Sequence, residues 1–153
     1  MRGFGVTTGK TATTILKGDG WYPDLAVAEF LELYRLPAEY AESLIADHLE
    51  LARLWAAVQL APWRIEQEVV KGYAKIDEIP VRGMEKGAML LYKRAVFSHA
   101  KAILLQQFPS IERRESARND AKEAPETANQ FFATAQRALA IMAGRTFVAV
   151  EAL

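Results

Sequence analysis

Apolar side chains recur along most of the chain at spacings of three and four residues, the period of an α-helix that is buried along one face. The longest segment of this kind begins near residue 38 and runs at least to residue 60. It carries two adjoining apolar stripes, so its apolar face is wide, and we expect the helix to contact more than one partner. The first stripe is Leu44, His48, Leu51, Trp55 and Val58, and the second is Ala41, Ile45, Leu49, Ala52 and Ala56. Pro62 is expected to kink or break the helix.

Four further segments have the same period and predict helices. A short helix should follow WYPD (residues 21–24), with Asp24 as its cap or as an acid in its first turn, and should end at Leu36-Pro37. Its apolar face is Leu25, Ala28, Phe30, Leu31, Leu33 and Tyr34. The other predicted helical segments are residues 63–71, which Gly72 ends, residues 84–107, which Phe108-Pro109 ends, and a last helix from residue 119 or 125 to residue 143, which Gly144 follows.

The two ends of the chain lack the helical period. Residues 1–23 are rich in glycine and threonine, which favour extended or turn structure, and predict a flexible N-terminal arm that can carry a short strand. Residues 145–153 read as an extended tail with strand character, which should pair with the N-terminal arm or with another protein. The sequence therefore predicts an all-α fold, a bundle of about four helices over residues 24–144, with an extended arm at each end.

Composition narrows the class of protein. The chain has 153 residues, with 19 Lys and Arg against 19 Asp and Glu, so no overall field attracts it to nucleic acid or to a membrane. The absence of cysteine excludes disulfides, thiolate zinc sites and cysteine nucleophiles. No apolar run reaches the ~18 residues that span a bilayer, and there is no signal-peptide core. These features predict a protein made and used in the cytoplasm, without a membrane partner.

The stretch GFGVTTGKTATT, residues 3–14, resembles a nucleotide-binding loop because it contains Gly9, Lys10 and Thr11 in succession. A phosphate loop requires a glycine five positions before that Gly-Lys-Thr, and Phe4 occupies that position. It also requires a buried strand before the loop and a helix after it, but only two residues precede Gly3 and the following TATTILKGDG is a poor helix former. We therefore expect no nucleotide cofactor, and interpret the stretch as a Gly/Thr arm.

No constellation of residues predicts catalysis or metal binding. A di-iron helical bundle requires Glu three residues before each ligand histidine, but Ile45 precedes His48 and Val96 precedes His99 in this way. His48 falls on an apolar stripe, which favours a hydrogen-bonded core or interface histidine, and His99 is expected to be similar or partly exposed. Ser98 adjoins His99 but points about 100° away on a helix. We predict no catalytic, cofactor or metal residues.

The densest basic cluster lies in the charged stretch of residues 110–124, which is otherwise typical of a solvated loop. Acidic residues are interleaved with the basic ones, and no aromatic residue is available to stack on bases. A sequence-specific DNA reader is therefore excluded, whereas a neutral, hydrophilic lining past which DNA slides fits the pattern. The candidate residues facing such a channel are Arg113, Arg114, Arg118 and Lys122.

Four segments in order resemble the head completion proteins of tailed phages, of the gpL type. They are WYPDL (21–25), EFLELYRLPAEYAESLIADHLELARLW (29–55), LLYKRAVFSHAKAILLQQFPSI (90–111) and FFATAQRALAIMAGRTFVAVEAL (131–153). The third contains a Tyr-x-Arg-Ala-Val core at residues 92–96, and the last has Ala140 and Ile141 before Gly144. The resemblance covers about residues 20–153, and the arm before Trp21 lies outside it.

The resemblance implies a structural protein of the phage neck, a head–tail connector found in the virion after assembly in the host cytoplasm. Such a protein binds below the portal ring after DNA packaging, retains the DNA and provides the surface on which the tail docks. The expected partners are the portal protein, the tail terminator or next neck protein, further copies of the chain in a twelvefold ring, and packaged DNA held without sequence specificity. Candidate contacts of the tail with portal or neighbouring subunit are Phe147, Val148, Val150 and Leu153. From the residues alone, a small helical protein–protein interaction or regulatory module remains the alternative.

Overall fold

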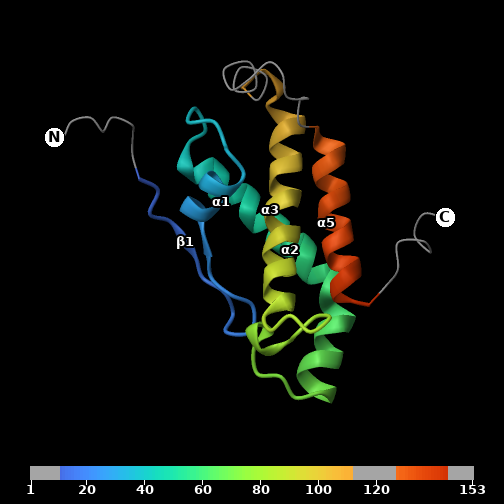
Figure 1. Ribbon diagram of the computed structural model, residues 1–153. Coiled ribbons are helices and arrows are strands. Elements are labelled where there is room, and N and C mark those ends of the chain that lie inside the picture. The colour runs from blue at the N-terminus through green and yellow to red at the C-terminus, as the bar shows by residue number, and fades with distance from the viewer. Residues whose placement is uncertain (1–10, 112–126, 145–153) are drawn as a thin grey trace.

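The computed structural model describes residues 11–111 and 127–144 of the chain (Figure 1). The described part is mainly helical, which confirms the predicted class, and it contains one two-stranded sheet. The bundle of about four helices stays a prediction, because the first helix has only seven residues. The elements are β1 (Ile15–Leu16), β2 (Leu25–Ala26), α1 (Val27–Leu33), α2 (Glu42–Ile65), the π-helix η2 (Glu66–Val70), the 3-10 helix η3 (Ile76–Glu78), α3 (Gly87–Gln107) and α5 (Ala128–Met142).

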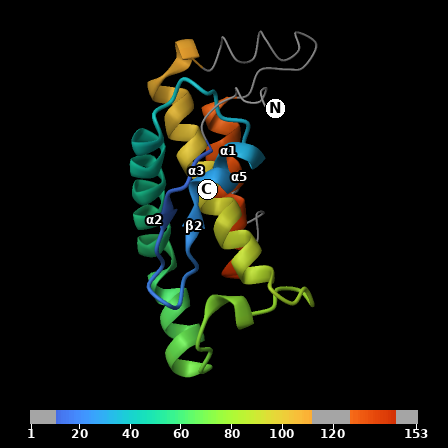
Figure 2. The same cartoon turned by 90° about the vertical axis from the view of Figure 1, so that its left-hand side faces the viewer.

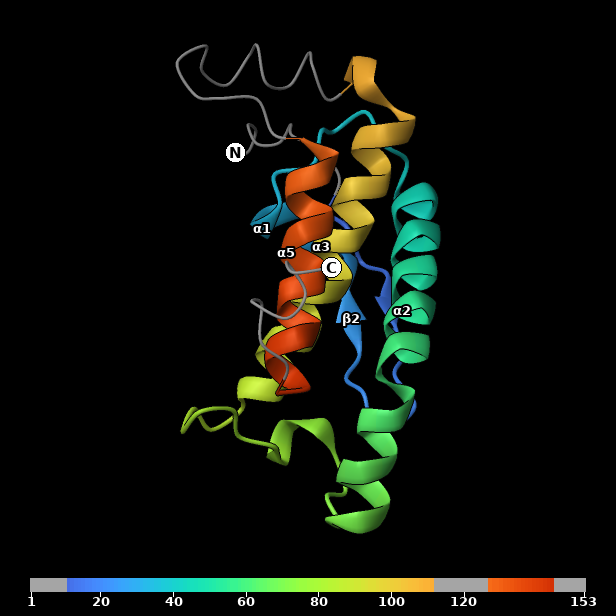
Figure 3. The ribbon, with the colours of Figure 1, turned by 90° about the vertical axis from the view of Figure 1, so that its right-hand side faces the viewer.

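The helices are arranged in layers around α3. α5 runs antiparallel beside α3, and α2 crosses behind both in the view of Figure 1. The two side views show α2 as an outer layer on one side, with α3 between it and the layer formed by α1 and α5 (Figures 2 and 3). Alanine side chains line the buried faces and let the helix backbones approach closely. The buried alanines of the long helices are Ala52, Ala56, Ala88, Ala95, Ala100, Ala102, Ala135, Ala138 and Ala140.

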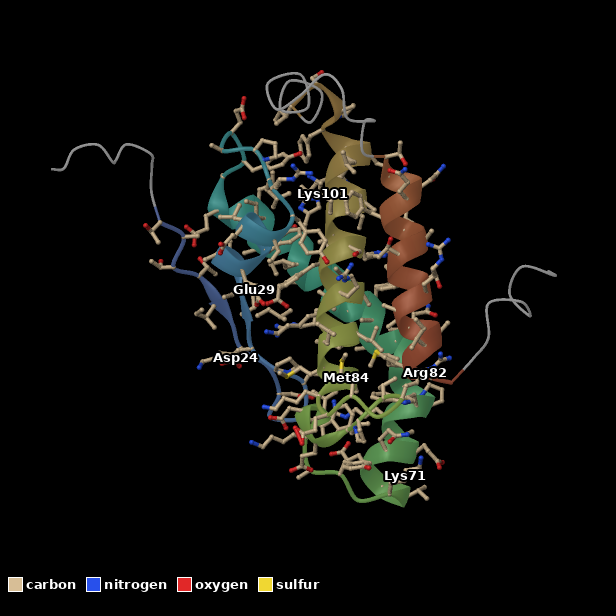
Figure 4. All side chains as sticks on the ribbon, in the orientation of Figure 1. Asp24, Glu29, Lys71, Arg82, Met84 and Lys101 are labelled. Carbon is tan, nitrogen blue, oxygen red and sulfur yellow. The ribbon has the colours of Figure 1, made fainter. Side chains whose placement is uncertain are left out.

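Because α3 is covered on two sides, even polar side chains are buried along it. Tyr92 and Phe97 are fully enclosed, and Ser98 and Lys101 are as inaccessible as their apolar neighbours. Figure 4 places Lys101 in the upper half of α3, far from Lys71 at the lower end beyond α2. α3 therefore forms the centre of the core, although Leu90 and Arg94 on its remaining side are exposed.

α2 differs from its prediction at both ends. It begins at Glu42 rather than near residue 38, and it continues through Pro62 to Ile65, where η2 extends it to Val70. Of the two predicted effects of Pro62, the break is therefore wrong, and the kink stays a prediction. The proline lies in the last turn of α2 and removes one backbone hydrogen bond, while Leu60 and Gln67 on either side of it remain buried. The predicted stop at Gly72 is confirmed by its left-handed backbone (φ +80°).

The segment WYPD does not open a helix. Leu25 and Ala26 instead form β2, which pairs antiparallel with β1, so that Leu16 lies opposite Leu25. α1 starts only at Val27, without any side-chain cap. Asp24 is therefore not the predicted cap or first-turn acid. Its carboxylate accepts a hydrogen bond from the backbone N–H of Gly18 (2.8 Å), which ties the two arms of the hairpin together.

The remaining helix boundaries follow local contacts. α3 begins at Gly87 rather than Met84, because Met84 forms a β-bridge with Val81 that folds the chain against the helix start. α5 begins at Ala128 after a capping box, in which Thr127 and Gln130 exchange side-chain and backbone hydrogen bonds. The predicted starts at residues 119 and 125 lie outside the described residues.

Candidate interaction surfaces

The part of the predicted N-terminal arm that the structure describes is packed on the helices. Leu16, Trp21 and Tyr22 belong to the hydrophobic core. The Trp21 indole N–H donates to the carbonyl of Tyr73 (3.1 Å), and the Tyr22 ring stacks on Tyr92 of α3 with a centroid distance of 4.6 Å. Residues 11–23 are thus held to the domain, whereas the division of the chain at residue 23 stays a prediction.

An ion pair fixes this segment to the lower part of α2. Arg64 donates to the Asp19 carboxylate (2.6 Å), while its guanidinium lies 4.7 Å from the Trp21 ring centroid and 5.0 Å from that of Tyr22. Burial opposes ionisation of Asp19, but hydrogen bonds from Arg64 and from the amides of Tyr22 and Trp21 outweigh it and lower the pKa of Asp19 to about 2. Burial raises the pKa of Tyr22 to about 12.

A second anchor lies at the start of α2. The Glu42 carboxylate accepts hydrogen bonds from the backbone N–H of Thr13 (3.0 Å) and of Thr14 (2.8 Å), and from the Thr14 hydroxyl. Downstream of Thr11 the chain forms β1 and no helix up to Gly20, as its composition predicted. Gly9 and Lys10 lie outside the described residues.

α2 presents an apolar stripe to solvent on its outer side. Leu51, Leu54, Val58 and Ile65 are 50%, 62%, 64% and 59% exposed. At 100° per residue these four side chains lie within one sector of the helix, roughly opposite the buried sector. They define the α2 stripe, about 21 Å long at 1.5 Å per residue. The second predicted stripe forms the core, apart from Ala41, whereas Leu51 and Val58 of the first remain uncovered.

A groove lies on the opposite side of the molecule, where α1, α3 and α5 meet. Its volume is about 390 Å³. Exposed Leu33 of α1 and exposed Leu90 of α3 line it, with half-buried Phe131 of α5 beside them. We call it the α1–α3–α5 groove. Figures 2 and 3 show α1 and α5 on one side of α3 and α2 on the other, so the elements that line the groove lie away from the outer side of α2.

The groove is lined by charged side chains, and one charged residue lies at the end of the α2 stripe. Arg35, Lys93 and Arg94 line the groove together with a single acid, Glu29, which accepts from Lys93 (3.2 Å). Figure 4 labels Glu29 on the α1 side of the molecule. On α2, exposed Asp47 lies one turn before the α2 stripe on the same sector of the helix. The groove is therefore basic, and the α2 side has an acidic residue at its end.

The two histidines are packing residues. His48 is buried, with its Nδ1 2.9 Å from the carbonyl oxygen of Leu44 and its Nε2 2.9 Å from the side-chain oxygen of Gln107, as predicted for a hydrogen-bonded core histidine. The ring of His99 stacks on Trp55 at 4.0 Å, and burial lowers the pKa of His99. Within residues 11–111 and 127–144, no group of three His, Asp or Glu side chains is placed to hold a metal ion.

The residues that the sequence singled out lie elsewhere in the chain. The candidate channel residues Arg113, Arg114, Arg118 and Lys122, and the candidate tail contacts Phe147, Val148, Val150 and Leu153, all fall outside the described residues. The structure instead shows the α2 stripe and the α1–α3–α5 groove. The over-wide apolar face of α2 was the sequence signal for the stripe, but no pattern pointed to the groove, because three separate elements build it.

Comparison with known proteins gives concordant matches. The chain matches the family model described as phage head completion protein (GPL) over residues 16–153. It is 30% identical over 113 residues to a probable head completion/stabilization protein of Haemophilus phage HP1, covering 69% of this chain and 71% of that protein. No solved structure matches the chain. In the described part of the chain, no helix has the length and apolarity that crossing a membrane requires.

Proposed function

Because the chain belongs to the phage head completion protein (GPL) family, we propose that it completes the neck of a tailed phage by binding below the portal ring after DNA packaging. Its family is one of structural head completion proteins of the phage particle. In the proposed role it retains the packaged DNA and provides the surface on which the tail docks. The single observation that carries the proposal is the match to the family over residues 16–153.

The described surface supports an assembly role. Soluble monomeric proteins rarely leave a long row of large apolar side chains uncovered, so the exposed α2 stripe supports a contact with another protein. A twelvefold ring matched to the portal would use this kind of surface between its subunits. The regulatory-module alternative has no separate observation in its favour once the family is known.

The ends of the chain have proposed roles in the same assembly. Arg113, Arg114, Arg118 and Lys122, interleaved with acids, would give the channel a hydrophilic lining of little net charge, which permits DNA to slide without tight binding. Phe147, Val148, Val150 and Leu153 would add a strand to a neighbouring subunit or to the portal.

Electron microscopy of reconstituted complexes tests the proposal. Purified portal rings are mixed with the chain, and we expect extra density at the ring surface that faces away from the head interior. Heads produced without the chain should lose DNA and fail to join tails, and adding the purified chain should restore both. A portal that remains bare, together with heads that mature normally without the chain, would contradict the proposal. A chain truncated after Gly144 tests the tail, and we expect weaker portal binding with an unchanged circular dichroism spectrum.

A further inference from the structure

The molecule has two unlike surfaces on opposite sides of one core, a convex apolar helix and a concave groove. We propose that the α2 stripe of one copy packs into the α1–α3–α5 groove of the next copy, so that the chain assembles head to tail. This inference rests on the proposed function, which calls for a ring of identical subunits, and it names the surfaces that would form the contact between them.

The placement of the two surfaces selects head-to-tail packing. A contact between different surfaces of identical subunits continues from copy to copy, and closes into a ring when the rotation between neighbours permits it. If the α2 stripe met its own counterpart on a second copy, the contact would be two-fold and would stop at a dimer. It would also leave Leu33 and Leu90 of the groove exposed.

Shape and charge are complementary between the two surfaces. The α2 stripe projects from one side of a long helix, and the α1–α3–α5 groove, about 390 Å³ in volume, is a hollow that can accept such side chains. Leu54 and Val58 lie in the middle of the stripe and would meet Leu33 and Leu90. Asp47 at the end of the stripe carries the charge opposite to that of Arg94 at the groove. Opposite charges on the two surfaces favour this pairing.

Cross-linking between introduced cysteines tests the contact directly. The chain has no cysteine of its own, so every introduced thiol is a unique reporter. Leu54→Cys is produced together with Leu90→Cys, both variants are incorporated into phage heads, and the purified heads are treated with a short bis-maleimide. We expect a cross-linked dimer that contains one copy of each variant, and no cross-link in heads made with either variant alone.

A matched control and the contrary outcomes make the test decisive. Gln59→Cys lies on the same helix, exposed but about 100° away from Val58, and paired with Leu90→Cys it should give no dimer. A dimer formed by Leu54→Cys alone would show a two-fold contact and overturn the proposal. Heads that contain both variants but give no cross-link would show that another protein covers the stripe, and would also overturn it. If the chain is absent from the heads, the proposed function fails and this inference falls with it.

A charge placed in the stripe provides a second readout. Val58→Asp should leave the folded chain intact because this side chain is 64% exposed. We expect heads that no longer incorporate the chain as a ring, and an unchanged thermal unfolding midpoint of the isolated protein. Gln59→Asp, with the same introduced charge beside the stripe, should assemble normally. Normal ring assembly by Val58→Asp would overturn the head-to-tail contact even if portal binding is retained.

Discussion

Replacing Asp19 with asparagine tests how strongly the N-terminal segment is fastened to α2. One carboxylate oxygen of Asp19 accepts from the backbone N–H of Trp21 (3.0 Å) and of Tyr22 (2.9 Å), and the other accepts from Arg64 (2.6 Å). Asparagine keeps an oxygen for the two amides, but it removes the charge and turns an N–H₂ donor toward the guanidinium. Asp19→Asn thus isolates the charged part of the contact.

The magnitude follows from the lowered pKa. The pKa of Asp19 falls from an ordinary value of 3.8 to about 2 in the folded chain. At about 1.36 kcal/mol for each pH unit, this shift corresponds to a stabilisation of the fold by at most about 2.4 kcal/mol. Because the side chain is 51% exposed, solvent screening reduces the expected stabilisation to about 1 kcal/mol. Since the folded pKa is the lower one, the ionised form stabilises the fold. The contribution is complete above pH 3.8 and is lost as the pH falls toward 2.

Urea unfolding followed by tryptophan fluorescence measures this contribution. At pH 7 we expect Asp19→Asn to reduce the free energy of unfolding by about 1 kcal/mol, and near pH 2 we expect the two proteins to converge. Asp47→Asn is the control, because Asp47 is an exposed carboxylate far from this contact, and should change the free energy of unfolding by less than about 0.5 kcal/mol at pH 7. An equal loss at both pH values would refute the charge argument, and no loss at pH 7 would refute the anchoring role.

Substitutions at four further positions test the packing and the capping of α5. Gly18→Ala should reduce the free energy of unfolding by about 3 kcal/mol, because the added Cβ would lie 2.1 Å from the carbonyl oxygen of Tyr22. Gly20→Ala has open space around the added Cβ but a φ of +92°, and should reduce it by only about 1 kcal/mol. Urea titrations that reverse this order would contradict the steric argument. Thr127→Ala removes the side-chain cap of α5 and should reduce the free energy of unfolding by about 1 kcal/mol. Thr127→Ser keeps a capping hydroxyl and should retain most of this stability in the same assay. Phe97→Ala in the centre of α3 should cost about 3–5 kcal/mol, and a loss below 1 kcal/mol would show that the site is not packed as described.

Helical periodicity predicted which residues share a face, and this was enough for most of the core. Ile45, Leu49, Ala52 and Ala56 are buried as one stripe of α2, and His48 has the hydrogen-bonded environment expected of it. Periodicity cannot say what lies opposite a face. Two apolar stripes on α2 are compatible with two internal neighbours or with one neighbour and a free surface, and the outer part of α2 is in fact uncovered.

A short strand in the N-terminal arm was predicted, and β1 confirms it, but its partner β2 was missed because the local signals there fit another structure equally well. WYPD has the proline and the acid of a helix start, and only the antiparallel pairing of Leu25 with Leu16 commits the backbone to a strand. The groove was missed for a related reason, since Leu33 and Leu90 meet only after α1 and α3 have packed. In contrast, the order of four segments was sufficient to identify the family, which the match over residues 16–153 confirms.

The alanine-rich packing around α3 has a consequence for the size of any ring. If neighbours meet through the α2 stripe and the α1–α3–α5 groove, each subunit acts as a wedge, and the angle between these two surfaces sets the rotation from one subunit to the next. A closed ring of twelve copies would require a rotation of about 30° per subunit. Ala52 and Ala56, buried on α2, fix the thickness of this wedge because small side chains let α2 approach its neighbours closely. A larger side chain at one of these buried positions would tilt α2 and open the wedge. The number of subunits is then encoded in the interior of the protein rather than in the residues that touch the neighbour.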